Sequence, residues 1–337
     1  MKKLTLTAIA VASAFAASAN AAEVYNADNL ALSVGGRVEA RTELSDKGKD
    51  DVLKADKREG QDDISRARIN IDAKTNITDS VFAHGFFEKE FRKDAANGDN
   101  DTRYLFVGIG NENNELQYGK TDGSLGLITD YTDILNTYGA EASSKSATAD
   151  RADNQLLYIG NYGDLTVKAN FNGGGAAVSK SFFDDNGVKV PNKDINSTID
   201  KGYGAAASYD FGMFKLGAGY ANETHTGNAK DSDNILVGLG SNVTDALYLS
   251  ALYVNGSQLG DDFQGYELAG SYAFTEKLTL ASTFTSANFD SEKDDRNQAA
   301  LDLGYQFTSY FKTYAGISKK FTQDEELKGM LGAKVTF

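Results

Sequence analysis

The chain has 337 residues, of which 34 are lysine or arginine and 48 are aspartate or glutamate, so its formal net charge is −14. This acidity argues against a nucleic-acid-binding protein, because such binding depends on basic residues that neutralise phosphates. Cysteine is absent, which excludes a disulfide framework and a thiolate metal site. The acidic surplus favours a field that attracts cations, although acidity serves only solubility in many proteins.

The chain begins with a segment typical of a secretory signal. Lys2 and Lys3 precede an uncharged stretch that ends in the small-residue motif ANA at residues 19–21. This pattern predicts a cleaved signal peptide over residues 1–21 and a mature chain over residues 22–337, and its flanks and length disfavour an uncleaved membrane anchor. Loss of the two lysines gives the mature chain a charge of −14 minus 2, or −16. No later run of about 18 apolar residues predicts a helical membrane span.

Strict alternation of polar and apolar residues marks the segment RARINIDAK, residues 66–74. In an extended chain, successive side chains point to opposite faces. One face therefore carries Arg66, Arg68, Asn70 and Asp72, and the other carries only alanine and isoleucine. The same pattern suits a sheet that covers a soluble core and the wall of a water-filled tube in lipid.

In chain order, the sequence predicts many amphipathic strands joined by short and long connections. Alternation is clear at residues 30–41, 66–74, 165–171, 214–220, 266–274, 301–307 and 331–337. Short turn signals lie at residues 76–79, 110–113, 161–164, 210–213, 242–245, 274–277 and 307–310. Longer polar segments include residues 43–63, 121–153, 172–201 and 222–233. The seven turns join fourteen strands, and the first and last segments raise the total to sixteen, an even number that suits a closed antiparallel barrel.

The character of the two strand faces favours a barrel in a membrane. The polar faces are rich in Gly, Ser, Thr and Asn, whereas a soluble sandwich would expose mostly charged residues. The chain contains 17 tyrosines and 19 phenylalanines, and these recur near strand ends on the apolar face. Aromatic residues at both rims of an apolar band mark the interfaces of a transmembrane barrel. We therefore predict an all-β, 16-stranded antiparallel transmembrane barrel, with a soluble sandwich as the alternative.

Several segments are similar to the general diffusion porins of Gram-negative outer membranes, and most of all to their OmpU-like branch. They are the mature start AEVYNADNLALSVGGRVEAR, the segment TRYLFVGIGNENNELQYGKTDG at residues 102–123, the loop YTDIL at residues 131–135, and the terminal Phe337. The resemblance implies an outer-membrane homotrimer in contact with lipid and lipopolysaccharide. It also implies that the third long loop, residues 121–153, folds into the barrel as a constriction loop, and that Phe337 helps the assembly machinery to recognise the chain.

The resemblance assigns acidic residues to the constriction loop. In the family, a Met-Leu-Pro-Glu-Phe-Gly-Gly-Asp run follows the YTD motif, and Asp133 and Glu141 match carboxylates of that pattern. Asn136 replaces the proline and Thr137 replaces the glutamate of the family pattern. Asp130 stands where relatives often carry glycine, and we expect it to supply negative charge nearby.

The resemblance also assigns a row of basic residues to the facing wall, namely Arg37, Arg68, Arg103 and Arg151. Strand periodicity independently places Arg37 and Arg68 on polar faces. Leu105 and Val107 share the periodic face of Arg103, and we expect these bulky side chains to pack against the inserted loop.

These features predict a passive pore for ions and small hydrophilic solutes. Carboxylates facing guanidinium groups set up a transverse field that disfavours apolar solutes, and the acidic total predicts a mild preference for cations. A substrate-specific channel with an aromatic track is one alternative. An outer-membrane enzyme is another, because His84 lies in step with Glu88 and Glu90, although no serine motif accompanies it. The acid-rich loops lack calcium-loop spacing, and we expect neither metal nor cofactor.

Overall fold

The structure is a computed structural model that describes eleven ranges of the chain. They are residues 22–27, 29–46, 61–93, 102–139, 145–175, 181–183, 189–191, 198–227, 229–291, 295–322 and 325–337. The predicted signal peptide, residues 1–21, lies outside these ranges and stays a prediction. Within the described residues, no helix combines the length and the apolar character that crossing a membrane requires.

Nearly all of the described elements are strands. The first half of the chain contains β1 (Ala22–Ala27), β2 (Leu30–Ser45), β3 (Gln61–Asp63), β4 (Arg66–Asn76), β5 (Phe82–Arg92), β6 (Thr102–Gly110), β7 (Asn114–Thr121), helix α1 (Gly126–Thr129), the 3-10 helix η3 (Ala147–Ala149), β8 (Ala152–Tyr162) and β9 (Leu165–Asn172). The second half contains β10 (Ser181–Phe183), β11 (Lys189–Pro191), β12 (Ile199–Asp210), β13 (Phe214–His225), β14 (Ser232–Asn242), β15 (Leu247–Gln258), β16 (Asp261–Ala273), β17 (Leu278–Phe289), β18 (Arg296–Thr308), β19 (Phe311–Lys320) and β20 (Glu326–Thr336).

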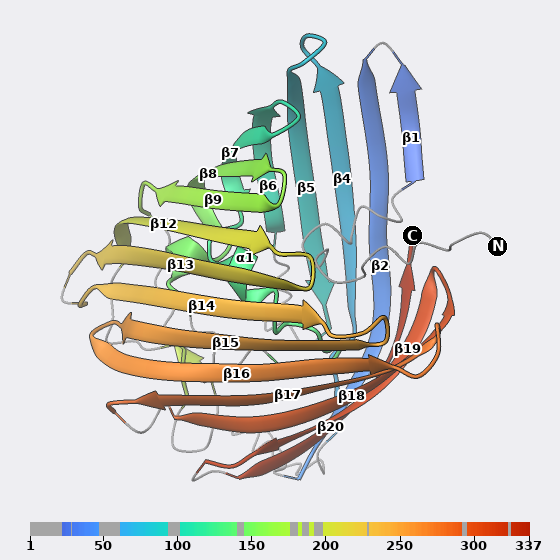
Figure 1. Ribbon diagram of the computed structural model, residues 1–337, viewed down its shortest axis with the longest axis vertical. Helices are drawn as coiled ribbons and strands as arrows, with labels where there is room; N and C mark the ends of the chain where they lie inside the picture. The colour runs from blue at the N-terminus through green and yellow to red at the C-terminus, as the bar shows by residue number, and fades with distance from the viewer. Residues whose placement is uncertain are drawn as a thin grey trace.

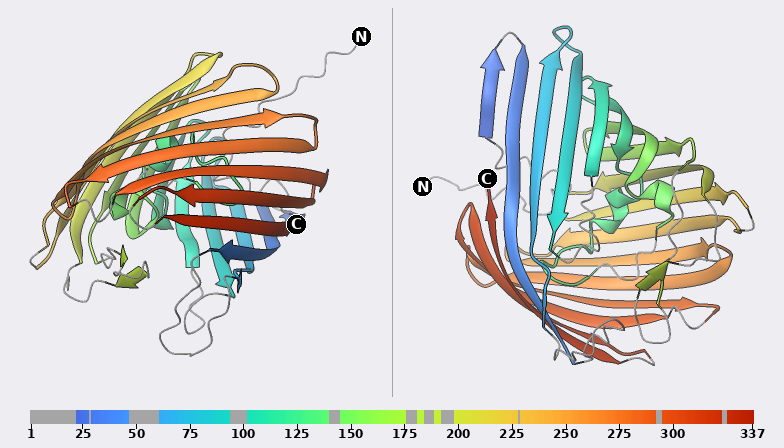
Figure 2. Two further views of the ribbon diagram at one scale, coloured as in Figure 1. Left: turned by 90° about the horizontal axis from the view of Figure 1, so that it is seen from below. Right: turned by 180° about the vertical axis from the view of Figure 1, so that it is seen from behind.

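The strands form one closed antiparallel ring around an interior (Figures 1 and 2). The main sheet has 18 strands, of which β1 and β3 pair only with β2, so 18 minus 2, or sixteen, make up the ring. The ring closes where β2 pairs with β20, from Arg37 opposite Thr336 to Ser45 opposite Lys328. The predicted sixteen-stranded barrel is therefore confirmed, and the seven predicted short turns join β4 to β5, β6 to β7, β8 to β9, β12 to β13, β14 to β15, β16 to β17 and β18 to β19.

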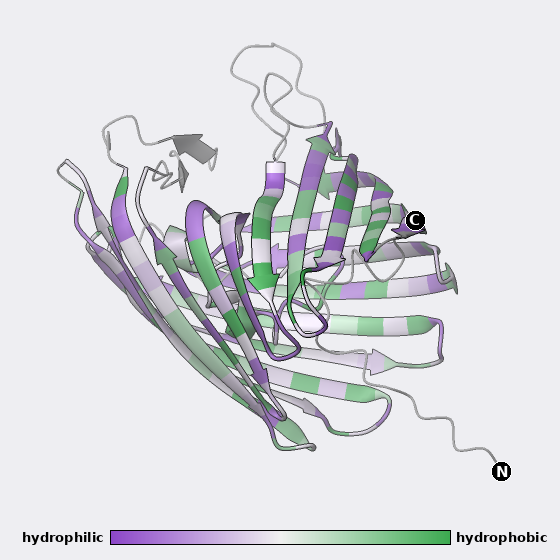
Figure 3. Cartoon of the chain, turned by 90° about the horizontal axis from the view of Figure 1, so that it is seen from above, coloured by the Kyte–Doolittle hydropathy of each residue, from purple (hydrophilic) through white to green (hydrophobic). Residues whose placement is uncertain are grey.

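The two faces of the ring differ sharply, as the bands of alternating hydropathy in Figure 3 show. On β4, Ile69 and Ile71 are 39% and 40% exposed on the outside, whereas Asn70 between them is 1% exposed on the inside. Burying polar side chains inside while exposing apolar ones outside is the reverse of a soluble sheet. The apolar face of the predicted strands therefore faces outward.

Aromatic rings gather at both ends of this outer apolar face. At the end with the short turns, exposed neighbours lie ring against ring, with centroids 4.6 Å apart for Tyr209 and Phe211 and 4.7 Å apart for Tyr305 and Phe307. Toward the other end, Tyr203 and Tyr220 lie 6.5 Å apart. Two aromatic rims that bound an apolar band are typical of a barrel whose outer surface contacts lipid.

Two small pairings were not expected from the sequence. β1 pairs with the start of β2, from Ala22 opposite Val34 to Ala27 opposite Leu30, and so continues along β2 beyond the end of β20. β10 and β11 pair with each other within a segment that the sequence indicates only as a long polar connection. Strands β1, β10 and β11 lack the long alternation that marks the strands of the ring, so periodicity alone does not reveal them.

The C-terminal residue takes part in closing the ring. The Gly36 amide donates to the Phe337 carbonyl at 2.8 Å, and the Phe337 amide donates to the Gly36 carbonyl at 3.0 Å. A Cβ atom at Gly36 would lie against the Arg68 carbonyl oxygen on β4 and 2.9 Å from Cζ of the Phe337 ring, both closer than side chains normally pack. The absence of a side chain at Gly36 thus makes room for the terminal ring.

We predict that Gly36→Val weakens the closure, because the added side chain must displace the Phe337 ring and the Arg68 backbone of β4. Overpacking of this kind costs about 1 to 3 kcal/mol. The folded fraction that survives stepwise heating in detergent, read from gel mobility, should fall at lower temperature. Gly85→Ala is the matched control, because a Cβ at Gly85 meets no atom within 4 Å. Equal heat resistance of the two variants would contradict the role of Gly36.

Candidate functional site: the constriction

The constriction loop lies inside the ring, on the concave side of the sheet (Figure 2). Leu125 and Ile128 are fully buried against the barrel wall. They pack over β13, where a Cβ at Gly217 or Gly219 would come 2.6 Å from the Ile128 or Leu125 side chain. Glycines on the inner face of β13 therefore create the space in which the loop sits, and the predicted inward fold of the third long loop is observed.

Hydrogen bonds fix the first part of the loop to three strands. The Tyr131 hydroxyl shares a 2.5 Å hydrogen bond with Ser208 on β12, and the Tyr248 hydroxyl on β15 donates to the Tyr131 carbonyl at 2.9 Å. Thr132 Oγ1 donates to Glu267 Oε2 on β16 at 2.5 Å. Because these residues are buried or half-buried, the bonds hold the loop at a defined depth in the lumen.

Asn136 and Thr137, two of the residues that depart from the family pattern, fix the next part of the loop. Asn136 Nδ2 donates to Asp302 Oδ1 on β18 at 2.7 Å. Thr137 lies directly against Gly316 on β19, in space that a Cβ would fill. These two side-chain contacts hold the loop at the position where the family pattern has a conformationally restricted proline. Glu141, the third predicted acidic residue, lies outside the described residues, and its assignment stays a prediction.

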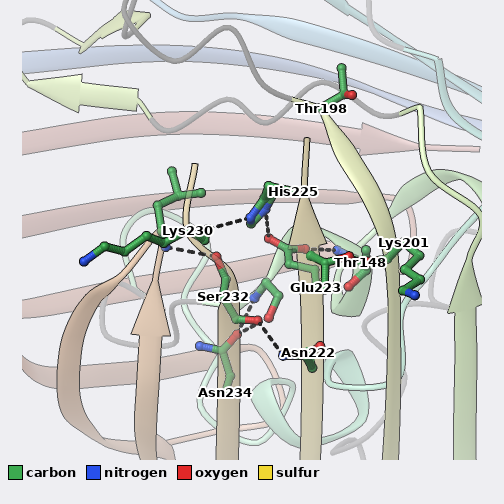
Figure 4. A network of polar contacts seen from close by, with 12 residues as sticks. Thr148, Thr198, Lys201, Asn222, Glu223, His225, Lys230, Ser232 and Asn234 are labelled. Carbon is green, nitrogen blue, oxygen red and sulfur yellow. Dashed lines mark hydrogen bonds and ion pairs between the residues drawn. The ribbon is translucent and has the colours of Figure 1, made fainter. Parts of the chain in front are cut away.

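A polar network holds the returning part of the loop (Figure 4). The Thr148 amide in η3 donates to Glu223 Oε2 on β13 at 3.0 Å. Glu223 Oε1 lies 3.2 Å from His225 Nε2, and the other ring nitrogen, Nδ1, donates to the Lys230 carbonyl at 2.7 Å. Glu223 therefore connects the constriction loop with the connection between β13 and β14.

The predicted carboxylates Asp130 and Asp133 lie on this loop directly after α1. Burial raises the pKa of Asp130 to about 6, against the opposing charges of Lys168 and Lys145. Burial also raises the pKa of Asp133, and Lys145 opposes this shift too. Lys145 itself forms a 3.1 Å ion pair with Asp150. Neither Asp130 nor Asp133 has an ion pair with any other residue that the structure describes.

Arginines occupy the part of the ring that contains β2, β4 and β6, and we call Arg37, Arg66, Arg68 and Arg103 the basic wall. α1 contacts β12, β13 and β14, on the other side of the ring order. Arg37 and Arg68 face inward as predicted, and they lie opposite each other in the ladder of β2 and β4. The structure therefore separates the basic wall from the carboxylates that follow α1.

Three buried glutamates, which the sequence analysis did not assign to the constriction, lie among these arginines. Glu39, Glu88 and Glu90 are only 2%, 2% and 5% exposed. Arg66 Nε lies 2.5 Å from Glu39, and Arg37 lies 3.8 Å from the same carboxylate. A buried charge is tolerated when it is paired and hydrogen-bonded. The wall is thus a network of alternating charges instead of a purely basic row.

The remaining two arginines of the wall use Glu88 and Glu90. Arg68 bonds to Glu90 and lies 3.8 Å from Glu88, and Arg103 Nε donates to Glu88 Oε1 at 2.7 Å. Periodicity gave a hint of this network, because Glu39 follows Arg37 by two residues and so shares its face. Which acid meets which arginine depends on strand register, which the sequence pattern does not supply.

The expectation for Leu105 and Val107 is wrong. They are 58% and 67% exposed on the outer face, so they do not pack against the constriction loop. The pairing of β5 with β6 shifts between Glu88 and Lys89, which leaves Arg103 as an extra residue of β6. Such a bulge re-aims a side chain, and here it turns Arg103 inward although Leu105 points out.

Arg151 lies at the base of the constriction loop and contacts Tyr104 instead of joining the basic wall. Its guanidinium carbon lies 5.2 Å from the centre of the Tyr104 ring, and the Tyr104 hydroxyl donates to Asp122 at 2.7 Å. His84, considered above with Glu88 and Glu90, contacts Asp72 at 3.3 Å and Glu115 at 2.8 Å. Its carboxylate partners are therefore not those that periodicity suggested.

We predict that Asn136→Asp detaches the loop from β18, because a carboxylate cannot donate to Asp302 and the two charges repel. In a planar bilayer, the variant should show more frequent partial closures of the ion current. Adding Asp302→Asn should restore steady current, since the new amide can donate to the new carboxylate. Steady current in the single variant, or closures that persist in the double variant, would contradict the anchoring role.

Comparison with known proteins assigns the family. The family described as Gram-negative porin matches residues 5–325. Porin-like protein L of Photobacterium profundum is 39% identical over 333 residues, covering 93% of this chain and 91% of that protein. Outer membrane protein U of Vibrio parahaemolyticus is 33% identical and covers 100% of this chain and 95% of that protein.

Solved structures agree on the fold. The structure of Salmonella typhi OmpF in complex with daunomycin matches with a TM-score of 0.76 at 19% identity, covering 94% of this chain and all of that one. The family match extends over almost the whole chain, and the solved structure shares its overall fold. The chain belongs to the Gram-negative porin family and is a β-barrel porin of the outer membrane.

Proposed function

We propose that this porin is a general diffusion channel for ions and small hydrophilic solutes, with a mild preference for cations. The observation that carries the proposal is the contrast in charge pairing across the constriction. All four arginines of the basic wall share the carboxylates Glu39, Glu88 and Glu90. Asp130 and Asp133, in contrast, have no ion pair within the described residues, so their negative charge acts on the lumen.

Physical arguments set the direction of the preference. An ion pair presents little net charge to a passing ion, whereas an unpaired carboxylate attracts cations over roughly a Debye length of about 8 to 10 Å. The net charge of −14 adds to this field at the pore entrances. The ion pairs of the basic wall still act as local dipoles. Their transverse field orders the water in the lumen and disfavours apolar solutes.

A substrate-specific channel is the second candidate, and one observation favours it. Phe86 lies with ring centroids 5.7 Å from Tyr104 and 5.8 Å from Phe106, all on the inner face of β5 and β6. Such a cluster resembles the start of an aromatic track. Phe106 is only 8% exposed, however, and Tyr104 is engaged by Asp122 and Arg151. Liposome swelling separates the candidates, since a general pore gives rates that follow solute size and a specific one saturates with one sugar.

We also propose that the protein works as a homotrimer in contact with outer-membrane lipid and lipopolysaccharide. Its outer apolar band, bounded by aromatic rims, supports the lipid contact. The solved trimer form of Vibrio cholerae OmpT shares the fold at a TM-score of 0.66. Cross-linking of the protein in native membranes tests the trimer directly.

We predict that the reversal potential in a salt gradient has the sign of a cation-preferring pore and that the preference weakens in acid. The Asp130 pKa is raised to about 6, so its negative charge is present above that pH and is lost as the pH falls through it. The change should appear as the pH falls through about 6, and protonation of Asp133, whose pKa is also raised, adds to the loss of preference at lower pH.

Two variants and a control test this assignment. Asp130→Asn and Asp133→Asn should each shift the reversal potential toward anions near neutral pH, because each removes one lumen charge. Asp245→Asn, in the exposed turn between β14 and β15, should leave it unchanged. Anion preference of the parent protein, or aspartate variants that behave like the control, would refute the proposed preference.

A further inference from the structure

Two lysines face each other on the inner surface of the last two strands. Lys312 on β19 and Lys334 on β20 are direct partners in the antiparallel ladder. Lys312 shares its strand face with Tyr314, and Lys334 shares its face with Met330, both of which are buried inside the ring. Both lysines are half-buried. Like charges directly opposite on neighbouring strands destabilise a sheet, so this pair needs a physical explanation.

Neither lysine has a carboxylate partner of its own among the described residues. Neither ammonium group makes an ion pair or hydrogen bond within the part of the chain that the structure describes. Glu39 lies directly opposite Lys334 in the pairing of β2 with β20. Its oxygens, however, already accept from Arg66 Nε at 2.5 Å and from the Tyr314 hydroxyl at 2.6 Å. The charge of Glu39 acts on both lysines, but its oxygens are bonded to Arg66 and Tyr314 and it is shared with the basic wall.

A third cationic group completes the cluster. Arg37 lies on β2, the strand that pairs with β20, and its Nε is buried without a hydrogen-bond partner. The charges of Lys312 and Arg37 both act on Lys334. Asp302 acts on Lys312 from β18 and is, with Glu39, the second carboxylate whose charge acts on these cations; one of its oxygens accepts from Asn136 of the constriction loop and the other is buried without a hydrogen-bond partner. Three cations on three adjacent strands thus exceed the negative charge available to them.

We propose that Lys312, Lys334 and Arg37 form a binding site on the pore wall for multivalent oxyanions of the phosphate class. Lysine ammonium groups act as point charges with three donors each, and the Arg37 guanidinium adds positive charge from the neighbouring strand. A multivalent anion relieves the repulsion between both lysines at once, which one chloride ion cannot do. Charge-assisted hydrogen bonds to anionic oxygens are the strong ones in proteins.

This site has a consequence for permeation. An oxyanion held there adds negative charge to the lumen beside the constriction. While bound, it obstructs part of the pore and increases the preference for cations. Oxyanions in the medium thereby modulate both the current and the selectivity of the pore. The inference does not depend on the mild cation preference proposed above. It concerns how the current and the reversal potential change when an oxyanion is added, and not the reversal potential before the addition.

Pyrophosphate added to the protein in a planar bilayer tests the site at neutral pH and constant chloride. The single-channel current should fall in a saturable manner, and the reversal potential should move further toward cations. In the double variant Lys312→Gln, Lys334→Gln, the half-blocking concentration should rise by about tenfold or more, which corresponds to at least about 1.4 kcal/mol. Removing two opposed like charges should not impair folding, and heat resistance in detergent checks this.

Lys328→Gln is the matched control, because Lys328 lies on the same strand and face but is paired with Glu43 and Glu326, each at 3.6 Å. This variant should keep the parent's half-blocking concentration. Equal block in the parent and the double variant, or no saturable block in the parent, would overturn the site. Either result would leave the general diffusion pore standing, whereas an anion-preferring parent would refute the proposed selectivity and leave the lysine site untouched.

Discussion

Hydrogen bonding between β2 and β20 closes the sheet, and every other feature of this porin depends on that closure. In hydrocarbon, an unpaired backbone amide or carbonyl has no water to bind, so a sheet can span a membrane only when it has no open edge. The join is completed at Phe337, whose backbone bonds in both directions with Gly36. Once the ring is closed, strand alternation alone determines which side chains meet lipid and which meet water.

The interior shows how a wet lumen accommodates many charges in a small space. The basic wall is held by Glu39, Glu88 and Glu90, each nearly inaccessible to solvent. Pairing avoids the large cost of isolated buried charges and fixes the guanidinium groups in place. The constriction loop is held equally firmly, through side chains that reach β12, β15, β16 and β18. In the function proposed above, permeation is controlled by the few charges that pairing leaves over.

Sequence patterns predict the parts of this structure that repeat, because a two-residue period and short turns act locally. They place Arg37 and Arg68 on the inner face of their strands, and the strand count follows from the turns. They fail where an interaction depends on register or on a local irregularity. Glu90 meets Arg68 across 22 residues of chain, and the bulge at Arg103 turns that side chain inward although Leu105 points outward. The hydrogen bond from Asn136 to Asp302 likewise cannot be predicted from the sequence pattern, because it depends on where β18 lies relative to the loop.

The orientation of the strand faces is tested most directly by single cysteines, since the natural chain has none. Arg68→Cys and Ile69→Cys place a thiol on neighbouring residues that face opposite sides of β4. A charged, membrane-impermeant thiol reagent should reduce the current of the Arg68→Cys pore and leave the Ile69→Cys pore unchanged. Modification of Ile69→Cys with loss of current, while Arg68→Cys stays inert, would show that the water lies on the other side of the strand.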